Sequence, residues 1–207
     1  MSHRTAGLYR LLELPRIYEG LQKLLGAQTA RTRFVEEFVR PFAGARVLDV
    51  GCGTGALLEY LPAGVDYTGF DLNPAYIEAA RTRHGERGRF FVARVGGEID
   101  IDAARFDIVV AKALLHHLTD DEAAQLLRMS ARALAADGVF VSYDNVFYDG
   151  QPWFSRTLTA LDRGGGVRTP EGYRALASPH FASIETMLLT DMLRIPYAHF
   201  VMRARKR

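Results

Sequence analysis

Short apolar segments alternate with helical patterns through the middle of this chain, and this alternation limits the folds that it can adopt. The segments predicted as strands cover residues 46–50, 65–70, 89–93, 106–111 and 139–143. The segment at 106–111 is almost continuously apolar, which is typical of a strand that is buried on both faces. We therefore predict an α/β fold in which helices cover both faces of a parallel sheet through right-handed crossovers.

The helical patterns between the strands carry recognisable start signals. A helix is predicted over 74–83, because an Asn-Pro pair supplies a typical cap and first turn. The clearest amphipathic helix is predicted over 119–136, where Thr119 is the expected N-cap and Glu122 occupies the capping-box position. Residues 137–138, an Asp-Gly pair, are predicted to turn the chain into the fifth strand.

The chain has 207 residues, the length of one domain, and its N-terminal part is predicted to be helical. Residues 5–25 carry leucines near helical spacing, with a break at Pro15. A second helix is expected over 28–40. These helices would form an N-terminal cap, residues 1–41, on a single domain that covers 1–207.

The part of the chain that follows the ligand-binding core, residues 44–145, is expected to have a different organisation. Residues 146–180 are predicted to be a helical insertion that contains a glycine loop and shapes a pocket. Residues 181–207 contain two further predicted strands, over 181–189 and 195–202, which are expected to pair antiparallel at one edge. The expected total is about seven strands.

Charge and cysteine content exclude several classes of protein. Lys and Arg total 26 and Asp and Glu total 24, which gives a formal net charge of +2 without the basic stripe of a nucleic-acid binder. The basic end of the chain, from Arg203 to Arg207, is predicted to be a solvated terminus, and a weak contact with an anion is the alternative. The single cysteine, Cys52, is typical of a reducing compartment. With no signal-peptide pattern or membrane-length apolar run, we expect a cytoplasmic monomer or homodimer without nucleic-acid or membrane partners.

A glycine-rich loop lies where the first predicted strand is followed by a helix, in the sequence VLDVGCGTG at 47–55. Ligands of open α/β sheets bind at the carboxyl ends of the strands, where this loop would lie. Asp71 ends the next strand, and its carboxylate can accept hydrogen bonds from both hydroxyl groups of a ribose. The loop and the acid together predict a ligand that contains a nucleoside.

Asp49 discriminates between the possible nucleosides, because it lies two residues before the loop. Its negative charge would repel the pyrophosphate of a nicotinamide or flavin dinucleotide. The same charge suits a cationic ligand, and S-adenosylmethionine carries both an ammonium and a sulfonium group. We therefore predict S-adenosylmethionine as the cofactor, and the alternatives are a dinucleotide or a glycine turn without a ligand.

Four motifs make the chain resemble the class I S-adenosylmethionine-dependent methyltransferases over residues 44–145. They are VLDVGCGTG at 47–55, YTGFDLNPAYI at 67–77, FDIVVAKALLHHL at 106–118 and LAADGVFVSYDN at 134–145. The first two are specific, and the others follow in the right order and at the right spacing. The resemblance implies a Rossmann-like, doubly wound sheet of seven strands in the order 3-2-1-4-5-7-6, with strand 7 antiparallel. It also implies that S-adenosylhomocysteine is the product.

The resemblance further implies which residues bind the cofactor. Asp49 would face the methionine part and Asp71 the ribose, while Leu72 would pack against the adenine. Many members of the family have an acidic residue after the third strand for the adenine amine, but Arg94 stands there and cannot accept a hydrogen bond. A backbone carbonyl would then serve instead. The expected set is Asp49, Gly51, Cys52, Gly53, Gly55, Asp71, Leu72, Ala93, Arg94, Ala111 and Lys112.

Methyl transfer from a sulfonium is an in-line displacement, in which the protein mainly aligns the two reactants. A base is needed only when the acceptor must lose a proton. His116 and His117 follow the fourth strand, and at most one of them is expected to point at the cofactor. His116 and Asp144 are the candidate catalytic residues, and their alternative roles are packing and capping of a turn. No metal site is expected.

Residues outside the core are expected to shape the acceptor site. Tyr18 and Gln22 lie one helical turn apart, in a segment that would either cover the cofactor as a lid or pack as an ordinary helix. Aromatic side chains with an arginine in the insertion suit a small planar or anionic acceptor, with a satellite hydrophobic cluster as the alternative. The expected acceptor-site residues are Tyr18, Gln22, His117, Tyr143, Trp153, Arg163 and Tyr197.

We therefore predict a methyltransferase that acts on an oxygen, nitrogen or carbon atom of a small molecule. A chain of this length without an added recognition domain favours small acceptors over large RNA. One alternative is a non-catalytic module that binds S-adenosylmethionine. The other is an NAD-dependent oxidoreductase, which Asp49 disfavours.

Overall fold

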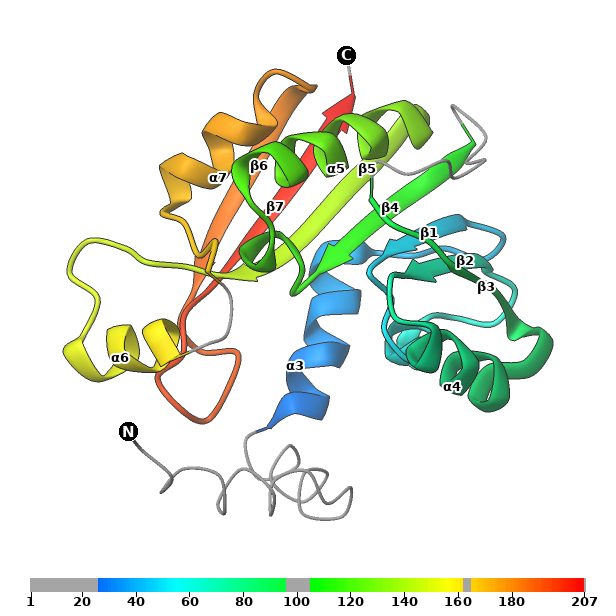
Figure 1. The fold of residues 1–207 in the computed structure, drawn as a ribbon, viewed down its shortest axis with the longest axis horizontal. Helices are drawn as coiled ribbons and strands as arrows, with labels where there is room; N and C mark the ends of the chain where they lie inside the picture. Colours follow the sequence, from blue (N-terminus) through cyan, green and yellow to red (C-terminus); the bar gives the residue numbers. More distant parts are fainter. Residues whose placement is uncertain (1–25, 96–104, 162–164, 207) are drawn as a thin grey trace.

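The computed structural model describes residues 26–95, 105–161 and 165–206, which form a seven-stranded sheet with helices around it (Figure 1). The strand order is β3-β2-β1-β4-β5-β7-β6. β7 runs antiparallel to both of its neighbours, and the other pairs are parallel. The predicted order is confirmed, including the antiparallel strand.

The bounds of the elements follow the alternating pattern of the sequence. The strands are β1 Arg46–Val50, β2 Asp66–Asp71, β3 Gly88–Val92, β4 Phe106–Lys112, β5 Leu134–Asn145, β6 Phe181–Leu189 and β7 His199–Lys206. The described helices are α3 Ala27–Arg33, α4 Pro74–His84, α5 Asp120–Ala133, α6 Trp153–Leu161 and α7 Pro170–Ala177. Shorter helical turns are η1 Phe34–Val39, η2 Ala56–Tyr60, η3 Gly85–Arg87 and η4 Leu115–His117.

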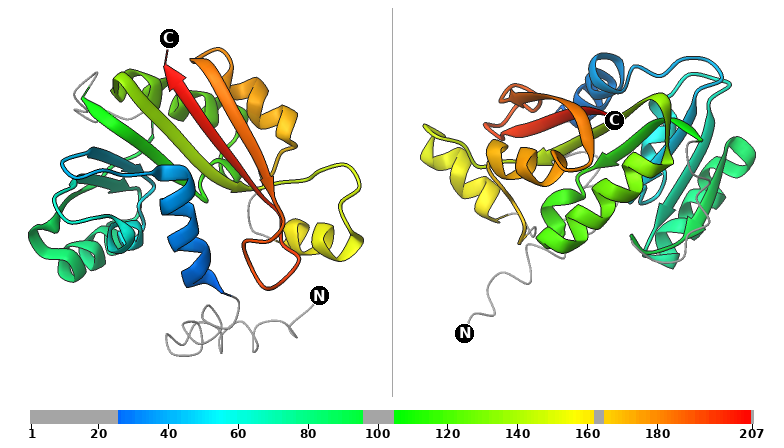
Figure 2. Two further views of the ribbon diagram at one scale, coloured as in Figure 1. Left: turned by 180° about the vertical axis from the view of Figure 1, so that it is seen from behind. Right: turned by 90° about the horizontal axis from the view of Figure 1, so that it is seen from above.

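Helices cover both faces of the sheet, so that α3 lies on the opposite side from α5 and α7 (Figure 2). The core on the α3 side includes Phe34, Leu58 and Ile77, from η1, η2 and α4. The core on the other side includes Leu126 of α5 and Phe140 of β5. Each such buried side chain contributes about 1.5–3 kcal/mol to the stability of the fold, so these two cores hold the strands in place. The strands lead into loops at their carboxyl ends.

Two helix starts that the sequence predicts are confirmed. The Thr119 hydroxyl accepts a hydrogen bond from the Glu122 N–H at 3.3 Å, and the Glu122 carboxylate accepts one from the Thr119 N–H at 3.1 Å. Asn73 caps α4 by accepting a bond from the Ala75 N–H at 3.0 Å, with Pro74 in the first helical position.

The junction between α5 and β5 differs from the prediction. α5 ends at Ala133 rather than at residue 136, and β5 begins at Leu134, so residues 137–138 lie inside an irregular strand. The β4–β5 ladder changes register after Phe106. Gly138 fits here because a Cβ atom would lie 2.9 Å from the Phe106 carbonyl oxygen. An Asp-Gly pair therefore marks a bulge here, not a turn.

The last strand was predicted over 195–202, and these bounds are wrong. β7 starts four residues later and runs to Lys206, because Pro196 has no N–H to donate to a ladder. Arg203 and Arg205 consequently lie within β7, where they alternate with buried residues such as Met202. Arg205 is exposed as expected, whereas Arg203 is partly buried.

The helix predicted over 28–40 is present, but its second half is the π-helix η1. The wider turns of η1 keep Phe34, Val35, Phe38 and Val39 in the core. The helix predicted over 5–25 lies outside the described residues. Among the helices that the structure describes, none has the length and apolar character to cross a membrane.

Candidate functional site

The carboxyl ends of β1, β2 and β4 meet at the loop that joins β1 to η2. The N–H groups of Gly51 and Cys52 donate to the Phe70 carbonyl at 2.9 and 3.0 Å, which ties this loop to the end of β2. Gly51 has a φ of +71°, and a Cβ atom there would lie 2.8 Å from the Leu114 side chain. A glycine is therefore required where the loop passes the segment that follows β4.

One cavity, of about 120 Å³, adjoins this loop, and we call it the Asp49 cavity. Its lining residues are Arg31, Phe34, Asp49, Gly51, Cys52, Ala56, Leu57, Tyr60 and Lys112. Charges of both signs line it, because Asp49 faces the same space as Arg31 and Lys112. Such a lining suits a zwitterion that carries an ammonium and a carboxylate group.

The charge of Asp49 is set by its burial and its neighbours. Its Oδ2 accepts a hydrogen bond from the Tyr67 hydroxyl at 2.6 Å. Burial raises the pKa of Asp49 to about 6, and the Tyr67 bond and the Lys112 charge oppose that rise. Burial lowers the pKa of Lys112, and the nearby Arg31 lowers it further. Asp49 is therefore ionised at neutral pH and takes up a proton in mildly acid solution.

A second cavity, of about 140 Å³, shares Gly51 with the first, and we call it the Asp71 cavity. Its lining residues are Gly51, Phe70, Asp71, Leu72, Ala93, Arg94, Val95, Leu114, Leu118 and Glu122. Asp71 accepts hydrogen bonds from the Gly53 N–H at 3.0 Å and from the Asn73 N–H at 2.8 Å. These bonds hold its carboxylate at the edge of a largely apolar cavity, which suits a nucleoside.

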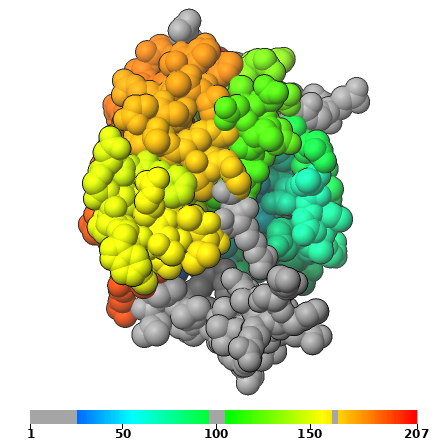
Figure 3. Space-filling view, turned by 60° about the vertical axis from the view of Figure 1, so that its left-hand side comes forward, coloured from blue at the N-terminus to red at the C-terminus, as the bar shows by residue number. Residues whose placement is uncertain are grey.

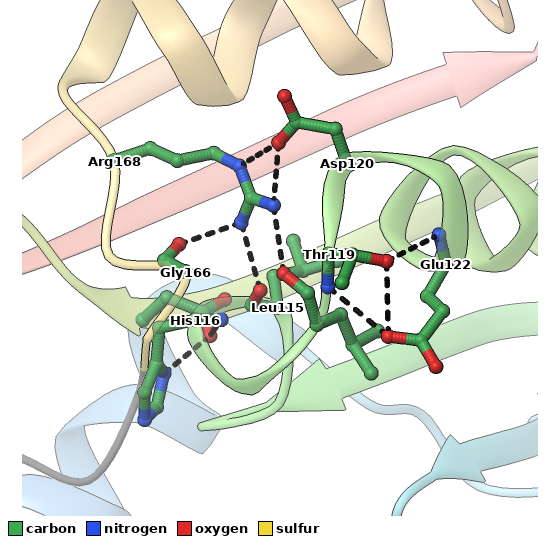
Figure 4. Close-up of polar contacts among 9 residues, drawn as sticks. Leu115, His116, Thr119, Asp120, Glu122, Gly166 and Arg168 are labelled. Atoms are coloured by element: carbon green, nitrogen blue, oxygen red, sulfur yellow. Dashed lines mark hydrogen bonds and ion pairs between the residues drawn. The ribbon is translucent and has the colours of Figure 1, made fainter.

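Glu122 reaches the Asp71 cavity from the first turn of α5, and the sequence indicated only its capping role. Its Oε2 accepts two hydrogen bonds from Thr119, each 3.1 Å long, and Oε1 remains as an acceptor atom (Figure 4). These bonds lower the pKa of Glu122, and the positive charge of Arg94 contributes to the same effect. The cavity thus contains an acidic side chain beside Asp71, although none stands directly after β3 in residues 93–97.

Most residues of the predicted cofactor set line one of the two cavities. Asp49, Gly51, Cys52 and Lys112 line the Asp49 cavity, and Asp71, Leu72, Ala93 and Arg94 line the Asp71 cavity. Gly53 contacts Asp71 through its N–H. Ala111 is fully buried in the core and lines neither cavity. Gly55 also lines neither cavity; a Cβ atom there would lie 2.9 Å from Phe90.

The predicted catalytic pair, His116 and Asp144, is brought together by η4 and the end of β5. Asp144 Oδ1 accepts a bond from the His116 backbone N–H at 3.2 Å and lies 2.9 Å from His116 Nδ1. The two side chains are only 3% and 1% exposed, and neither lines the Asp49 or the Asp71 cavity. A proton on Nδ1, directed at the carboxylate, leaves Nε2 as the basic nitrogen.

Arg168 holds the segment that carries His116 against the chain that leads into α7. Its guanidinium donates to the carbonyl groups of Leu115, Gly166 and Leu118 at 2.7–2.9 Å (Figure 4). It also donates twice to Asp120, at 2.7 and 2.9 Å. The position of η4 therefore depends on a side chain fifty residues away in the sequence.

The predicted acceptor residues are more dispersed than the cofactor set. Tyr143 is buried, with the Lys112 ammonium 5.5 Å from its ring centroid and the His199 ring 4.5 Å away. Trp153 is 78% exposed on α6, which forms part of the surface in Figure 3. Of the residues predicted to contact the acceptor, Tyr143, Trp153, His117 and Tyr197 line neither cavity. The others, Tyr18, Gln22 and Arg163, lie outside the described residues.

Comparison with known proteins identifies relatives of the part of the chain that carries both cavities. Residues 47–138 match a family described as "Methyltransferase domain". The human thiol S-methyltransferase TMT1A is 28% identical over 162 residues, which cover 73% of this chain and 66% of that protein. A ubiquinone biosynthesis O-methyltransferase from Xanthomonas axonopodis pv. citri is 37% identical over 125 residues, 58% of this chain and 51% of that protein. The chain thus spans between half and two thirds of these relatives.

Solved structures show the same fold at low sequence identity. The pyocyanin biosynthetic protein PhzM superposes with a TM-score of 0.71 and 18% identity, over 97% of this chain and 61% of that one. The YcgJ protein from Bacillus subtilis superposes with a TM-score of 0.66 and 17% identity, over 87% of this chain and 99% of that one.

Proposed function

We propose that this chain transfers a methyl group from S-adenosylmethionine to a small-molecule acceptor. Its residues 47–138 belong to the methyltransferase-domain family of the class I, S-adenosylmethionine-dependent type. S-Adenosylhomocysteine is the other product. The observation that carries the proposal is the pair of cavities that share Gly51. One is lined by charges of both signs and the other by a fixed carboxylate between apolar walls.

The Asp49 cavity supports binding of the amino-acid part of the cofactor. In our proposal Asp49 accepts hydrogen bonds from the ammonium group, and Arg31 and Lys112 face the carboxylate. Arg31 has no counterpart in the sequence motifs, because it comes from α3 and reaches the site only through the packing of that helix on the sheet.

The Asp71 cavity supports binding of the nucleoside. In our proposal the Asp71 carboxylate accepts hydrogen bonds from the ribose hydroxyl groups, and Leu72 packs against the adenine. Glu122 Oε1 is the acceptor that we assign to the adenine amine, in place of the acidic residue that is missing after β3. Arg94, on the same cavity wall, balances the negative charge of Glu122.

The acceptor that we propose is a small molecule methylated on an oxygen or sulfur atom. Both curated relatives carry one of these two acceptor atoms in their names, and the sequence alone leaves oxygen, nitrogen and carbon open. The sulfonium donor supplies an already activated methyl group, so that the chain must chiefly orient the acceptor in line with it and exclude water.

We assign His116 as the general base for an acceptor hydroxyl or thiol, with Asp144 as its positioning residue. The proton would pass to Nε2 of His116, while Asp144 holds the Nδ1 proton. Because His116 is buried, a packing role is the competing explanation.

For an identified acceptor, His116→Gln is expected to lower kcat at least about tenfold and to leave the cofactor Kd unchanged, because only proton removal is lost. Steady-state kinetics with both substrates varied would measure this. His180→Gln is the matched control and should retain kcat, because His180 lies between α7 and β6 and lines neither cavity. A His116→Gln enzyme with full kcat, or one with lowered stability and an unchanged pH profile, would support packing alone.

Asp71→Ala is expected to raise the Kd of S-adenosylmethionine at least about tenfold, or about 1.4 kcal/mol, because charge-assisted bonds to the ribose are lost. Isothermal titration of the wild type and the variant with S-adenosylmethionine, S-adenosylhomocysteine and NAD would measure it. An unchanged Kd in the variant would contradict the ribose role. Binding of NAD alone would indicate an oxidoreductase, and cofactor binding without turnover on any acceptor would indicate a binding module.

A further inference from the structure

A third cavity, of about 500 Å³, lies at the amino ends of the parallel strands, whereas the two cavities described above lie at their carboxyl ends. We call it the arginine groove. Its lining residues are Val39, Arg40, Phe42, Arg46, Asp107, Ile108, Ala135, Ala136, Asp137, Gly138, Val139, Arg203 and Arg205. They come from the amino ends of β1, β4 and β5, from the carboxyl end of β7, and from the end of η1 with the segment that follows it. Its volume is in the range of small-molecule sites.

The charges that line the groove do not cancel. Four arginines and two aspartates line the groove, and Arg46 forms a bidentate pair with Asp107 at 2.6 and 3.0 Å. Arg40 and Arg205 donate to backbone carbonyl groups, those of Glu37 at 2.7 Å and Asp137 at 3.1 Å. Within the described part of the chain, Arg40, Arg203 and Arg205 form no ion pair with a carboxylate.

Arg203 is the least satisfied of these side chains. Its Nε is buried and has no hydrogen-bond partner among the described residues. Burial lowers the pKa of Arg203, and the positive charge of Arg40 lowers it further, against a smaller opposing effect of Glu185 on β6. Buried donors without acceptors are uncommon in proteins, and two guanidinium groups that repel each other beside a cavity favour an anion between them.

We propose that the arginine groove binds the phosphate group of a small phosphorylated molecule. The guanidinium groups of Arg40 and Arg203 supply forked donors of the kind that bind phosphate in a bidentate manner. The two positive charges left over in the lining match a phosphate dianion. Phe42, which is 57% exposed at the groove, offers an apolar face to the organic part of the ligand. This site is separate from the proposed methyl-transfer site and does not depend on it.

The test is isothermal titration of the full chain with two probes, phenyl phosphate and inorganic phosphate, at low ionic strength. We expect saturable binding of phenyl phosphate below about 10 mM by the wild type. Arg203→Gln and Arg40→Gln should each raise its Kd at least about tenfold, since each removes one guanidinium from the phosphate. Arg132→Gln is the matched control, because Arg132 is exposed on α5 on the other face of the sheet.

The two probes separate the two parts of the proposed ligand. Phe42→Ala should weaken phenyl phosphate and leave inorganic phosphate unchanged, whereas the two arginine variants should weaken both. Arg40 is exposed, so that Arg40→Gln keeps the test decisive even if Arg203→Gln does not fold. Absence of saturable binding to the folded wild type, or equal binding by the wild type and Arg40→Gln, would overturn the proposal. Neither result would bear on the binding of S-adenosylmethionine at the carboxyl ends of the parallel strands.

Discussion

Asp49→Asn is expected to raise the Kd of S-adenosylmethionine at least about a hundredfold. The substitution keeps the shape of the side chain but removes a buried negative charge from the Asp49 cavity. The cofactor's ammonium would then lose its anionic partner, and losing one partner of a desolvated charge pair costs about 2–5 kcal/mol. Isothermal titration measures the change. Asp191→Asn, at an exposed carboxylate, is the matched control. Retention of wild-type affinity by Asp49→Asn would remove the basis of the assignment.

The pH dependence of binding gives a second readout of the same carboxylate. Asp49 has a pKa of about 6 in the folded chain, against an ordinary value of 3.8. Cofactor affinity should therefore be constant above about pH 7 and fall about tenfold per unit below pH 6, because binding requires the ionised form. The ligand-free protein should respond in the opposite sense: because the folded state holds this proton more tightly, the contribution of Asp49 to stability falls as pH rises from 3.8 through 6. In Asp49→Asn both effects should disappear.

The sequence predicts the sheet well because its signals are local. Apolar runs, the capping box at Thr119 and the glycines at 51–55 each act within a few residues, and the order of the strands follows from the family resemblance. The errors occur where a local signal has two structural solutions. The Asp-Gly pair at 137–138 is compatible with a turn or a bulge, and only the close approach of the Phe106 carbonyl selects the bulge.

The candidate site is less predictable where it depends on contacts between distant segments. Asp49 and Asp71 follow from strand ends and loop spacing, and they do line the two cavities. Arg31 reaches the Asp49 cavity only through the packing of α3, and Glu122 faces the Asp71 cavity only because α5 begins beside the residues that follow β3. Periodicity and spacing contain no information on either juxtaposition. The same holds for Arg203, whose Nε lacks a hydrogen-bond partner among the described residues once β7 is paired with β5 and β6.

Arg168 makes further contacts between distant segments, and its removal has the largest effect on the free energy of unfolding that we predict. Its side chain is 10% exposed and its guanidinium joins three backbone carbonyl groups to Asp120. Truncation would remove this donor from the carbonyl groups of Gly166 and Leu118, whereas the Leu115 carbonyl would keep its bond from the Leu118 N–H at 3.2 Å. Each unsatisfied buried group costs about 1–3 kcal/mol, partly offset where water can enter.

Arg168→Ala is therefore expected to lower the free energy of unfolding by about 4 kcal/mol, which corresponds to a fall in Tm of about 10 °C for a chain of this size. Thermal and urea unfolding would measure the change. Arg174→Ala is the matched control, because Arg174 is exposed on α7, and it should change stability by less than about 0.5 kcal/mol.

Arg168→Lys should resemble the alanine variant more than the wild type, since one ammonium cannot reach three carbonyl groups and Asp120 at once. Because η4 carries His116, the folded fraction of either variant should also lose turnover before it loses cofactor affinity. Equal stability of Arg168→Ala and Arg174→Ala would show that water replaces the guanidinium and that η4 is held by its packing alone.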